Sequence, residues 1–128
     1  MRNNKALNKY FFLLSCLFLL CACNTLFSIE RPPLIIFPDK LPNAHIGEMY
    51  HVEIQLTNAK TPPFYFYVVE ENLPKGLEFK WEDRKPLAIL EGTPEESGTF
   101  TITLSVGCLG TNISGQIGSK EYVLIIGN

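Results

Sequence analysis

The sequence predicts an all-β domain built as a two-sheet sandwich of about seven strands. After residue 33, no segment keeps a helical period of apolar residues. Short runs rich in β-branched and aromatic residues recur there instead, separated by Gly, Pro and Asn turn signals. Two of these runs alternate apolar and polar residues, which is the pattern of a strand with one buried and one solvated face.

Length and charge limit the classes of function. At 128 residues, 46% of them hydrophobic, the chain has room for one modest core. Arg2, Lys5 and Lys9 are the only charges before Glu30, and all three are positive. Residues 23–128 contain 8 Lys and Arg against 13 Asp and Glu, a formal net charge of −5. This acidic remainder has no basic cluster, which argues against nucleic acid as a partner and against electrostatic attachment to anionic lipid.

Residues 1–22 have the three parts of a secretory signal peptide. A basic start is followed by an apolar stretch from Tyr10 to Leu20 and then by small residues suited to a cleavage site. The stretch is 11 residues long, whereas a helix needs about 20 to span a bilayer. We therefore expect it to be removed, the alternative being an uncleaved membrane anchor.

The end of this segment, Leu20-Cys21-Ala22-Cys23, resembles the lipobox of bacterial lipoproteins. In that family an aliphatic residue at −3 and a small residue at −1 precede an invariant cysteine. The cysteine sulfur receives diacylglycerol, a dedicated peptidase cleaves before it, and the new amino terminus is acylated, for example with palmitate. The resemblance implies cleavage between Ala22 and Cys23 and a lipid anchor on Cys23. Because Asn24 is not the aspartate that retains lipoproteins in the inner membrane, it also implies the outer membrane in a cell with two membranes.

Two other cysteines could take the place of Cys23. Cleavage before Cys16, after Leu13-Leu14-Ser15, would leave an apolar stretch of only about 6 residues in the signal peptide. Cleavage before Cys21 would place the bulky Leu20 at −1. Both fit the lipobox less well. A metal-binding Cys-x-Cys is a further interpretation, but a structural zinc site needs about four ligands and no second cysteine pair follows.

The remaining cysteine and the two histidines are not expected to bind a metal ion. His45 and His51 are expected at the surface or at a strand edge. After cleavage only Cys23 and Cys108 remain. Because Cys23 would carry the lipid, no internal disulfide can form. Cys108 is then a free thiol, either a small buried hydrophobe or a site of pairing between chains.

Residues 23–33 are expected to form a lipidated N-terminus and a tether, which Pro32-Pro33 stiffens before the domain at 34–128. The runs at 50–56 and 99–106 show the clearest alternation. The run at 121–126 is apolar on both faces, so we expect it to be paired on both sides or covered by the tether. The predicted strands are residues 34–37, 50–56, 64–69, 77–81, 87–90, 99–106 and 121–126.

Four short motifs follow one another along the predicted domain. They are Gly47-Glu48-Met49-Tyr50, Leu73-Pro74-Lys75-Gly76-Leu77, Gly92-Thr93-Pro94 and Gly98-Thr99-Phe100. In the second motif proline presets the φ of a turn and glycine accepts a left-handed φ. In order and spacing the motifs resemble the immunoglobulin-like domain common in bacterial surface proteins, which is related to cadherin-like domains of dystroglycan type. The resemblance covers about residues 34–127 and implies an immunoglobulin-like sandwich.

One departure from that family concerns calcium. After the strand at 99–106 the family often carries an Asp and a Gly, whereas this chain has Val106-Gly107-Cys108-Leu109-Gly110. Calcium needs about six to eight oxygen ligands, and the only aspartates, Asp39 and Asp83, are far apart in the sequence. We therefore expect neither a calcium site nor another cofactor.

No set of residues in the sequence points to catalysis, and we expect a protein that is not an enzyme. The acidic pairs Glu70-Glu71, Glu82-Asp83 and Glu95-Glu96 are neighbours, and neighbours on a strand point to opposite faces. They are expected at wet turns or strand ends rather than as the paired carboxylates of a hydrolase. No Gly-x-Ser-x-Gly motif is present either. Asn112-Ile113-Ser114 matches a glycosylation sequon but is expected to belong to the Gly-rich loop 107–118.

Recognition is the function that remains. The run Phe64-Tyr65-Phe66-Tyr67 places aromatic side chains on both faces of one strand, and Trp81 is close in sequence. Tyr65, Tyr67 and Trp81 are the candidate binding surface for an envelope protein or a glycan. The competing interpretation is that one pair fills the core and the other is shielded.

These observations give two functional hypotheses. The first is a lipoprotein of the cell envelope, attached to the membrane through Cys23, whose domain binds a partner or acts as an accessory subunit. The alternative is an inhibitor or exclusion factor against a hydrolase or a phage, with loop 107–118 as its active element.

Overall fold

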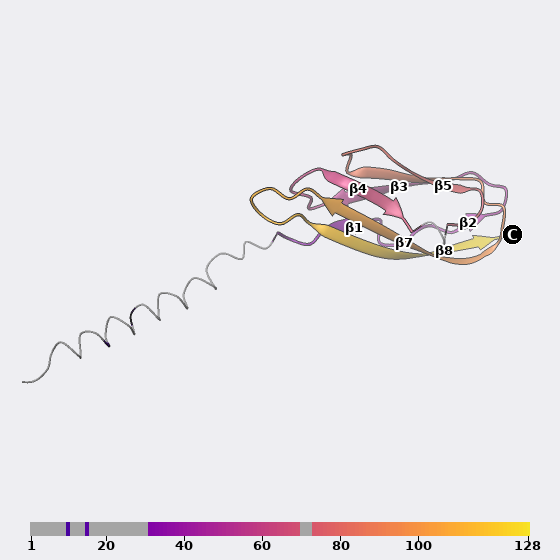
Figure 1. Ribbon diagram of the computed structural model, residues 1–128. Helices are drawn as coiled ribbons and strands as arrows, with labels where there is room; N and C mark the ends of the chain where they lie inside the picture. The colour runs from indigo at the N-terminus through magenta and orange to yellow at the C-terminus, as the bar shows by residue number, and fades with distance from the viewer. Residues whose placement is uncertain (1–9, 11–14, 16–30, 70–72) are drawn as a thin grey trace, which may run out of the picture. The chain divides into compact units, whose positions relative to one another are not determined.

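The computed structural model describes residues 10, 15, 31–69 and 73–128. Residues Arg31–Asn128 form a unit separate from residues 1–30, and this unit contains all the strands described (Figure 1). The predicted cleavage site at Ala22 and Cys23, and the tether up to residue 30, lie outside the described residues. Within the described ranges, no helix has the length and apolar character needed to cross a membrane.

The domain consists of two four-stranded sheets (Figure 1). The strand order is β1-β3-β6-β5 in the first sheet and β2-β8-β7-β4 in the second. Neighbouring strands are antiparallel except for β2, which runs parallel to β8. The strands are β1 (Ile35–Phe37), β2 (Ala44–His45), β3 (Tyr50–Thr57), β4 (Pro63–Val68), β5 (Leu77–Trp81), β6 (Leu87–Gly92), β7 (Gly98–Cys108) and β8 (Ile117–Gly127).

This strand order is that of an immunoglobulin-like sandwich. The order β1-β3-β6-β5 corresponds to strands A, B, E and D of the constant-type immunoglobulin fold, and β8-β7-β4 corresponds to G, F and C. The short strand β2 is an addition beside β8. The predicted all-β, two-sheet fold is therefore confirmed.

The predicted strands agree with the observed ones to within two residues at each end, with two larger differences. The two-residue strand β2 was too short to produce a pattern in the sequence. Strand β8 begins at Ile117 rather than at residue 121, because Gly118 and Ser119 are paired with Val106 and Ser105 of the long neighbour β7. At its other end β8 is paired on both sides, by β7 and by β2.

The core lies between the two sheets and follows the predicted alternation. In β3 every second residue is buried, and Ile54 is only 1% exposed. The residues between them, His51, Glu53 and Gln55, face solvent. On β8, Val123 and Ile125 are about half exposed, so the outer face of this apolar strand is only partly covered by the described residues. The fully buried side chains with the largest volumes are Ile54, Leu90, Ile102, Leu104, Leu124, Val106, Pro63, Pro74, Pro94 and Cys108.

Two glycines allow the turn before β5 to pack against the end of β6. Gly76 has a φ of +87° and Gly92 a φ of +138°, a region that L-residues with a side chain rarely adopt. A Cβ on Gly76 would overlap the carbonyl oxygen of Thr93, and one on Gly92 would overlap the carbonyl oxygen of Gly76. The two sequence motifs that contain these glycines therefore meet in space.

At one end of the sandwich, the side chain of Gln116 holds three segments together. Gln116 is 5% exposed, and it is the buried polar residue of the described core. Its Nε2 donates to the carbonyl oxygens of Pro32 (2.6 Å) and Asn58 (3.0 Å), and its Oε1 accepts from the backbone N–H of Lys60 (2.9 Å). We call this end, where residues 31–34, 58–63 and 109–117 meet, the tether end.

Arg31 adds a second set of contacts at the tether end. Its guanidinium donates to Thr111 Oγ1 at 3.0 Å and to Thr61 Oγ1 and the Leu109 carbonyl oxygen at 3.4 Å. Thr61 Oγ1 in turn donates to the same Leu109 oxygen at 2.6 Å. The compact domain therefore begins at Arg31, within the segment that the sequence assigned to the tether.

Candidate functional site

The aromatic run on β4 is rearranged by a β-bulge. Pro63 pairs with Cys108 and Tyr65 with Gly107, so two steps on β4 match one step on β7 and Phe64 is the extra residue. As a result Pro63 takes the buried position that alternation would give to Phe64. Phe66 is in the core, whereas Phe64 is 51% exposed. Three of the four aromatic side chains thus reach the surface, wholly or in part.

Tyr65 and Tyr67 lie side by side on the outer face of the sheet β2-β8-β7-β4, and we call them the tyrosine patch. Their ring centroids are 5.6 Å apart, and the Phe64 ring meets the Tyr65 ring edge to face at 4.7 Å. A Cβ on Gly107 would overlap the Tyr65 ring, so the ring lies directly over this glycine on the neighbouring strand. Tyr67 is 50% exposed. The patch is therefore an aromatic surface in which Tyr67 is open to solvent and Tyr65 is half-buried.

Hydroxyl groups surround this patch on the same face. Tyr67 is paired with Ser105 of β7, and the next outward residue of β7 is Thr103. Both are half-buried. On β8, Ile117 lies opposite Gly107 and is 75% exposed. The face offers aromatic rings, hydroxyls and an aliphatic side chain within three neighbouring strands.

Trp81 belongs to the other sheet. It ends β5, its ring packs partly against the core, and its Nε1–H donates to the carbonyl oxygen of Lys85 at 2.8 Å. This bond closes the β5–β6 hairpin. The structure therefore brings Tyr65 and Tyr67 together and places Trp81 in a separate setting.

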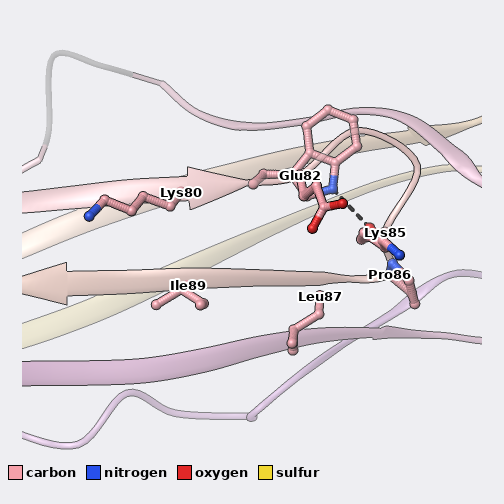
Figure 2. Close-up of a pocket in the computed structure, with 7 residues that line it drawn as sticks. Lys80, Glu82, Lys85, Pro86, Leu87 and Ile89 are labelled. Carbon is pink, nitrogen blue, oxygen red and sulfur yellow. Dashed lines mark hydrogen bonds between the residues drawn. The ribbon is translucent and has the colours of Figure 1, made fainter.

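A pocket of about 490 Å³ lies beside Trp81. Figure 2 shows Lys80 on β5, Leu87 and Ile89 along β6, and Glu82 and Lys85 at the hairpin turn between them. The volume falls in the range of small-ligand sites, about 300–1,000 Å³. Its lining is apolar with charged groups at the edge, which is compatible with a small amphipathic ligand.

One of these charged groups is committed to an ion-pair network on the outer face. Lys80 Nζ lies 2.8 Å from Glu91 Oε1 and 3.5 Å from Glu78 Oε2. His51 Nδ1 lies 2.9 Å from Glu91 Oε2. The hydrogen bond from Lys80, and then that with His51, holds the pKa of Glu91 below its usual range, and the bond to Glu91 raises the pKa of Lys80. The network spans β3, β6 and β5 and leaves Lys85 as the second cation of the pocket.

Cys108 is buried between the sheets at the tether end. It is 1% exposed and forms no disulfide with any residue that the structure describes. Burial raises the pKa of its thiol, an effect that the nearby Arg31 charge partly opposes. Of the two interpretations of this thiol, the structure shows the small buried hydrophobe.

Across residues 31–69 and 73–128, no three His, Cys, Asp or Glu side chains are grouped so that they could hold a metal ion.

Two buried tyrosines have raised pKa values for structural reasons. Burial raises the pKa of Tyr50 to about 12, and burial together with Asp39 raises that of Tyr122 to about 12. Their hydroxyls donate to the carbonyl oxygens of Pro42 and Pro38, respectively.

Comparison with solved structures shows a likeness of fold. The sialic acid binding region of a Streptococcus sanguinis SK1 adhesin, bound to 3'sLn, aligns with a TM-score of 0.59 at 14% identity. The alignment covers 77% of this chain and 30% of that chain. The SrpA adhesin from Streptococcus sanguinis aligns with a TM-score of 0.57 at 14% identity, covering 79% of this chain and 60% of that one. This chain thus spans less than two thirds of either adhesin chain.

Comparison of the sequence itself gives no assignment. Neither a scan of protein-family models nor a search of curated protein sequences finds a match.

Proposed function

We propose that this protein is a lipid-anchored binding protein of the cell envelope, which recognises its partner through the tyrosine patch and has no catalytic activity. The observation that carries the proposal is the arrangement of Tyr65 over Gly107 beside a half-exposed Tyr67. A folded domain gains little from leaving an aromatic ring such as that of Tyr67 half exposed to water, whereas aromatic side chains are enriched among the residues that dominate binding surfaces.

A glycan is the partner class that best fits the composition of this face. A sugar ring has an apolar face that can stack on an aromatic ring, and a rim of hydroxyls that can bond to Ser105 and Thr103. The SK1 adhesin region, which shares the fold, is bound to a sialylated glycan. A protein that presents a flat apolar surface is the other class compatible with the patch.

Binding by purified protein tests this proposal. We expect Tyr65→Ala and Tyr67→Ala each to weaken binding to a glycan array or to an immobilised envelope extract by about tenfold or more, the loss typical of a central aromatic contact. Phe37→Ala is the matched control, because Phe37 is an equally exposed aromatic residue (56%) on the other sheet. Equal effects of all three substitutions would assign the loss to something other than the tyrosine patch.

The anchoring part of the proposal is supported by the resemblance of Leu20-Cys21-Ala22-Cys23 to a lipobox. We expect mature protein to begin at Cys23 with a lipid on its sulfur, and to fractionate with the outer membrane in a cell with two membranes. Cys23→Ser, or inhibition of the lipoprotein signal peptidase with globomycin, should block processing. Unchanged processing and fractionation under both treatments would disprove anchoring at Cys23.

The inhibitor alternative depends on the loop that follows β7. This loop is tied to the domain, since Thr111 and Leu109 accept from Arg31 and Gln116 anchors its end. Deleting the loop would therefore disturb the fold. Substituting its exposed residues Asn112 and Ser114 tests the alternative without that complication, because an inhibitor would lose its target and a sheet-face binder would not.

A further inference from the structure

We propose that the tether end of the domain rests on the lipid surface, with Phe64, Leu109 and Ile117 in contact with the bilayer interface. The proposal rests on the lipid anchor at Cys23 proposed above and adds an orientation to it. The sandwich would then stand on the membrane by this end, with the tyrosine patch on its side and the C-terminus directed away from the lipid.

The first argument is the length of the chain between the anchor and the domain. The compact domain begins at Arg31, eight residues after Cys23. Eight residues span at most about 29 Å even when fully extended. Arg31 is held at the tether end by its bonds to Thr61, Thr111 and the Leu109 carbonyl oxygen. A lipid on Cys23 therefore keeps this end within about 29 Å of the anchor, while the opposite end with the C-terminus lies across the length of the sandwich (Figure 1).

The second argument is the set of side chains exposed there. Phe64 is 51% exposed, Leu109 38% and Ile117 75%. They come from three separate places in the chain, namely the bulge of β4, the loop after β7 and the first residue of β8. Pro32, Pro33 and Pro62 at the same end are exposed as well. Apolar and aromatic side chains of this kind gain free energy at the boundary between headgroups and acyl chains.

The third argument is the distribution of charge. The segments 31–34, 58–63 and 109–117 contain Arg31 and Lys60 and no Asp or Glu. Residues 31–128 as a whole contain 8 Lys and Arg against 12 Asp and Glu. An anionic membrane therefore repels most of the domain but not this end. The net charge cannot attach the protein to lipid, so the anchor supplies the affinity and the uneven charge selects which end faces the membrane.

The tether end is also stiff enough to keep one orientation. The bonds of Gln116 to Pro32, Asn58 and Lys60 fix the three segments to one another. Cys108 N–H donates to the Gln116 carbonyl oxygen at 2.8 Å, and Leu109 N–H donates to that of Pro62 at 3.3 Å. The three apolar side chains thus project from one firmly connected surface.

Fluorescence quenching on the full-length mature lipoprotein tests the orientation. A single cysteine is introduced by Phe64→Cys or, at the opposite end, by Met49→Cys, and is labelled with an environment-sensitive fluorophore. Met49 is 78% exposed, and its turn is bonded to Pro94 and Gly127 far from the tether end. Cys108 is buried and Cys23 would be blocked by lipid, so labelling is selective. The protein is reconstituted in vesicles of phosphatidylethanolamine and phosphatidylglycerol with brominated acyl chains.

We expect brominated lipid to quench the probe at position 64 severalfold more strongly than the probe at position 49, and aqueous iodide to do the reverse. In the Phe64→Cys background, adding Ile117→Ser and Leu109→Ser should reduce the lipid quenching toward the value at position 49. Equal quenching at both positions in protein whose mass shows the lipid would overturn the orientation and leave the anchor intact. A mass without the lipid on Cys23 would overturn the anchor and the orientation together.

Discussion

Removal of the Gln116 side chain gives the sharpest prediction about how the domain is held together. Gln116→Ala deletes three hydrogen bonds, to Pro32, Asn58 and Lys60, in a site that is 5% exposed. At about 1 kcal/mol for each bond, with the partners left poorly solvated, the loss in free energy of unfolding is about 3 kcal/mol. For a domain of this size, whose total stability is about 5–15 kcal/mol, this is a large fraction. The melting temperature should fall by about 12 °C or more.

The assay is urea unfolding followed by the fluorescence of Trp81, with limited proteolysis in parallel. Gln55→Ala is the matched control, since Gln55 is exposed on the outer face of β3 and should change the stability by no more than about 0.5 kcal/mol. In Gln116→Ala, cleavage after Lys60 by trypsin should become faster than in the wild type, because the backbone N–H of Lys60 loses its bond to Gln116 Oε1.

The conservative variant Gln116→Glu separates hydrogen bonding from packing. Its carboxylate would face the carbonyl oxygens of Pro32 and Asn58, to which it cannot donate when ionised. The pKa of this new carboxyl is therefore raised in the folded state, and its stability deficit should shrink as the pH falls through that value. A loss below about 1 kcal/mol in Gln116→Ala, or a deficit in Gln116→Glu that does not depend on pH, would refute the role given to these bonds.

Three further predictions concern buried or crowded side chains. Gly107→Ala should lift the Tyr65 ring from β7 while changing the free energy of unfolding by no more than about 1 kcal/mol, because a side chain moves more easily than the backbone. The chemical shifts of the ring report its displacement, and the urea midpoint reports the change in stability. A Tyr65 ring that does not move would contradict the prediction. Tyr50 and Tyr122 hold their protons to higher pH when folded than when unfolded, so stability is intact below about pH 10 and should be lost as the pH rises toward 12; urea midpoints across this range, compared with Tyr122→Phe, test the sign. The Cys108 thiol should react with Ellman's reagent only at the rate of unfolding, and rapid modification of the native protein would show that it is accessible.

The parts of the fold that follow from local patterns were predictable. In β3 and β7 one face meets the core and the other faces solvent, so the alternation of apolar and polar residues predicted both the strands and their buried sides. The turn at Gly76 was predictable because a left-handed φ favours glycine, whereas no such conformation was predicted for Gly92, the last residue of β6. What the motifs could not show is that the two glycines touch each other.

The parts that depend on tertiary pairing were not predictable. The alternation of buried and exposed residues along β4 would place Phe64 in the core. Only the register with β7 reveals the bulge that turns Phe64 outward. Gly118 and Ser119 read as loop, yet they extend β8 because β7 supplies the hydrogen-bond partners. Gln116 carries no signal in the sequence that marks it as buried, since its partners lie more than 50 residues away along the chain.

The candidate site was predictable in composition but not in arrangement. The sequence identified Tyr65 and Tyr67 as aromatic residues on one face, and the structure shows them side by side, with the Tyr65 ring over Gly107. Trp81 was grouped with them by proximity in sequence, whereas it closes a hairpin on the other sheet and borders a pocket there. Sequence distance across the β4–β5 connection says nothing about which sheet each strand joins.

The proposed role of the tyrosine patch is tested most directly by photo-crosslinking in living cells. Benzoylphenylalanine is incorporated at Tyr67 and, as the matched control, at Phe37, which has a similar exposure on the other sheet. We predict a discrete crosslinked product at position 67, to an envelope protein or a glycan-bearing molecule, and none at position 37. A product at position 37 alone, or the same products at both positions, would contradict recognition through the tyrosine patch.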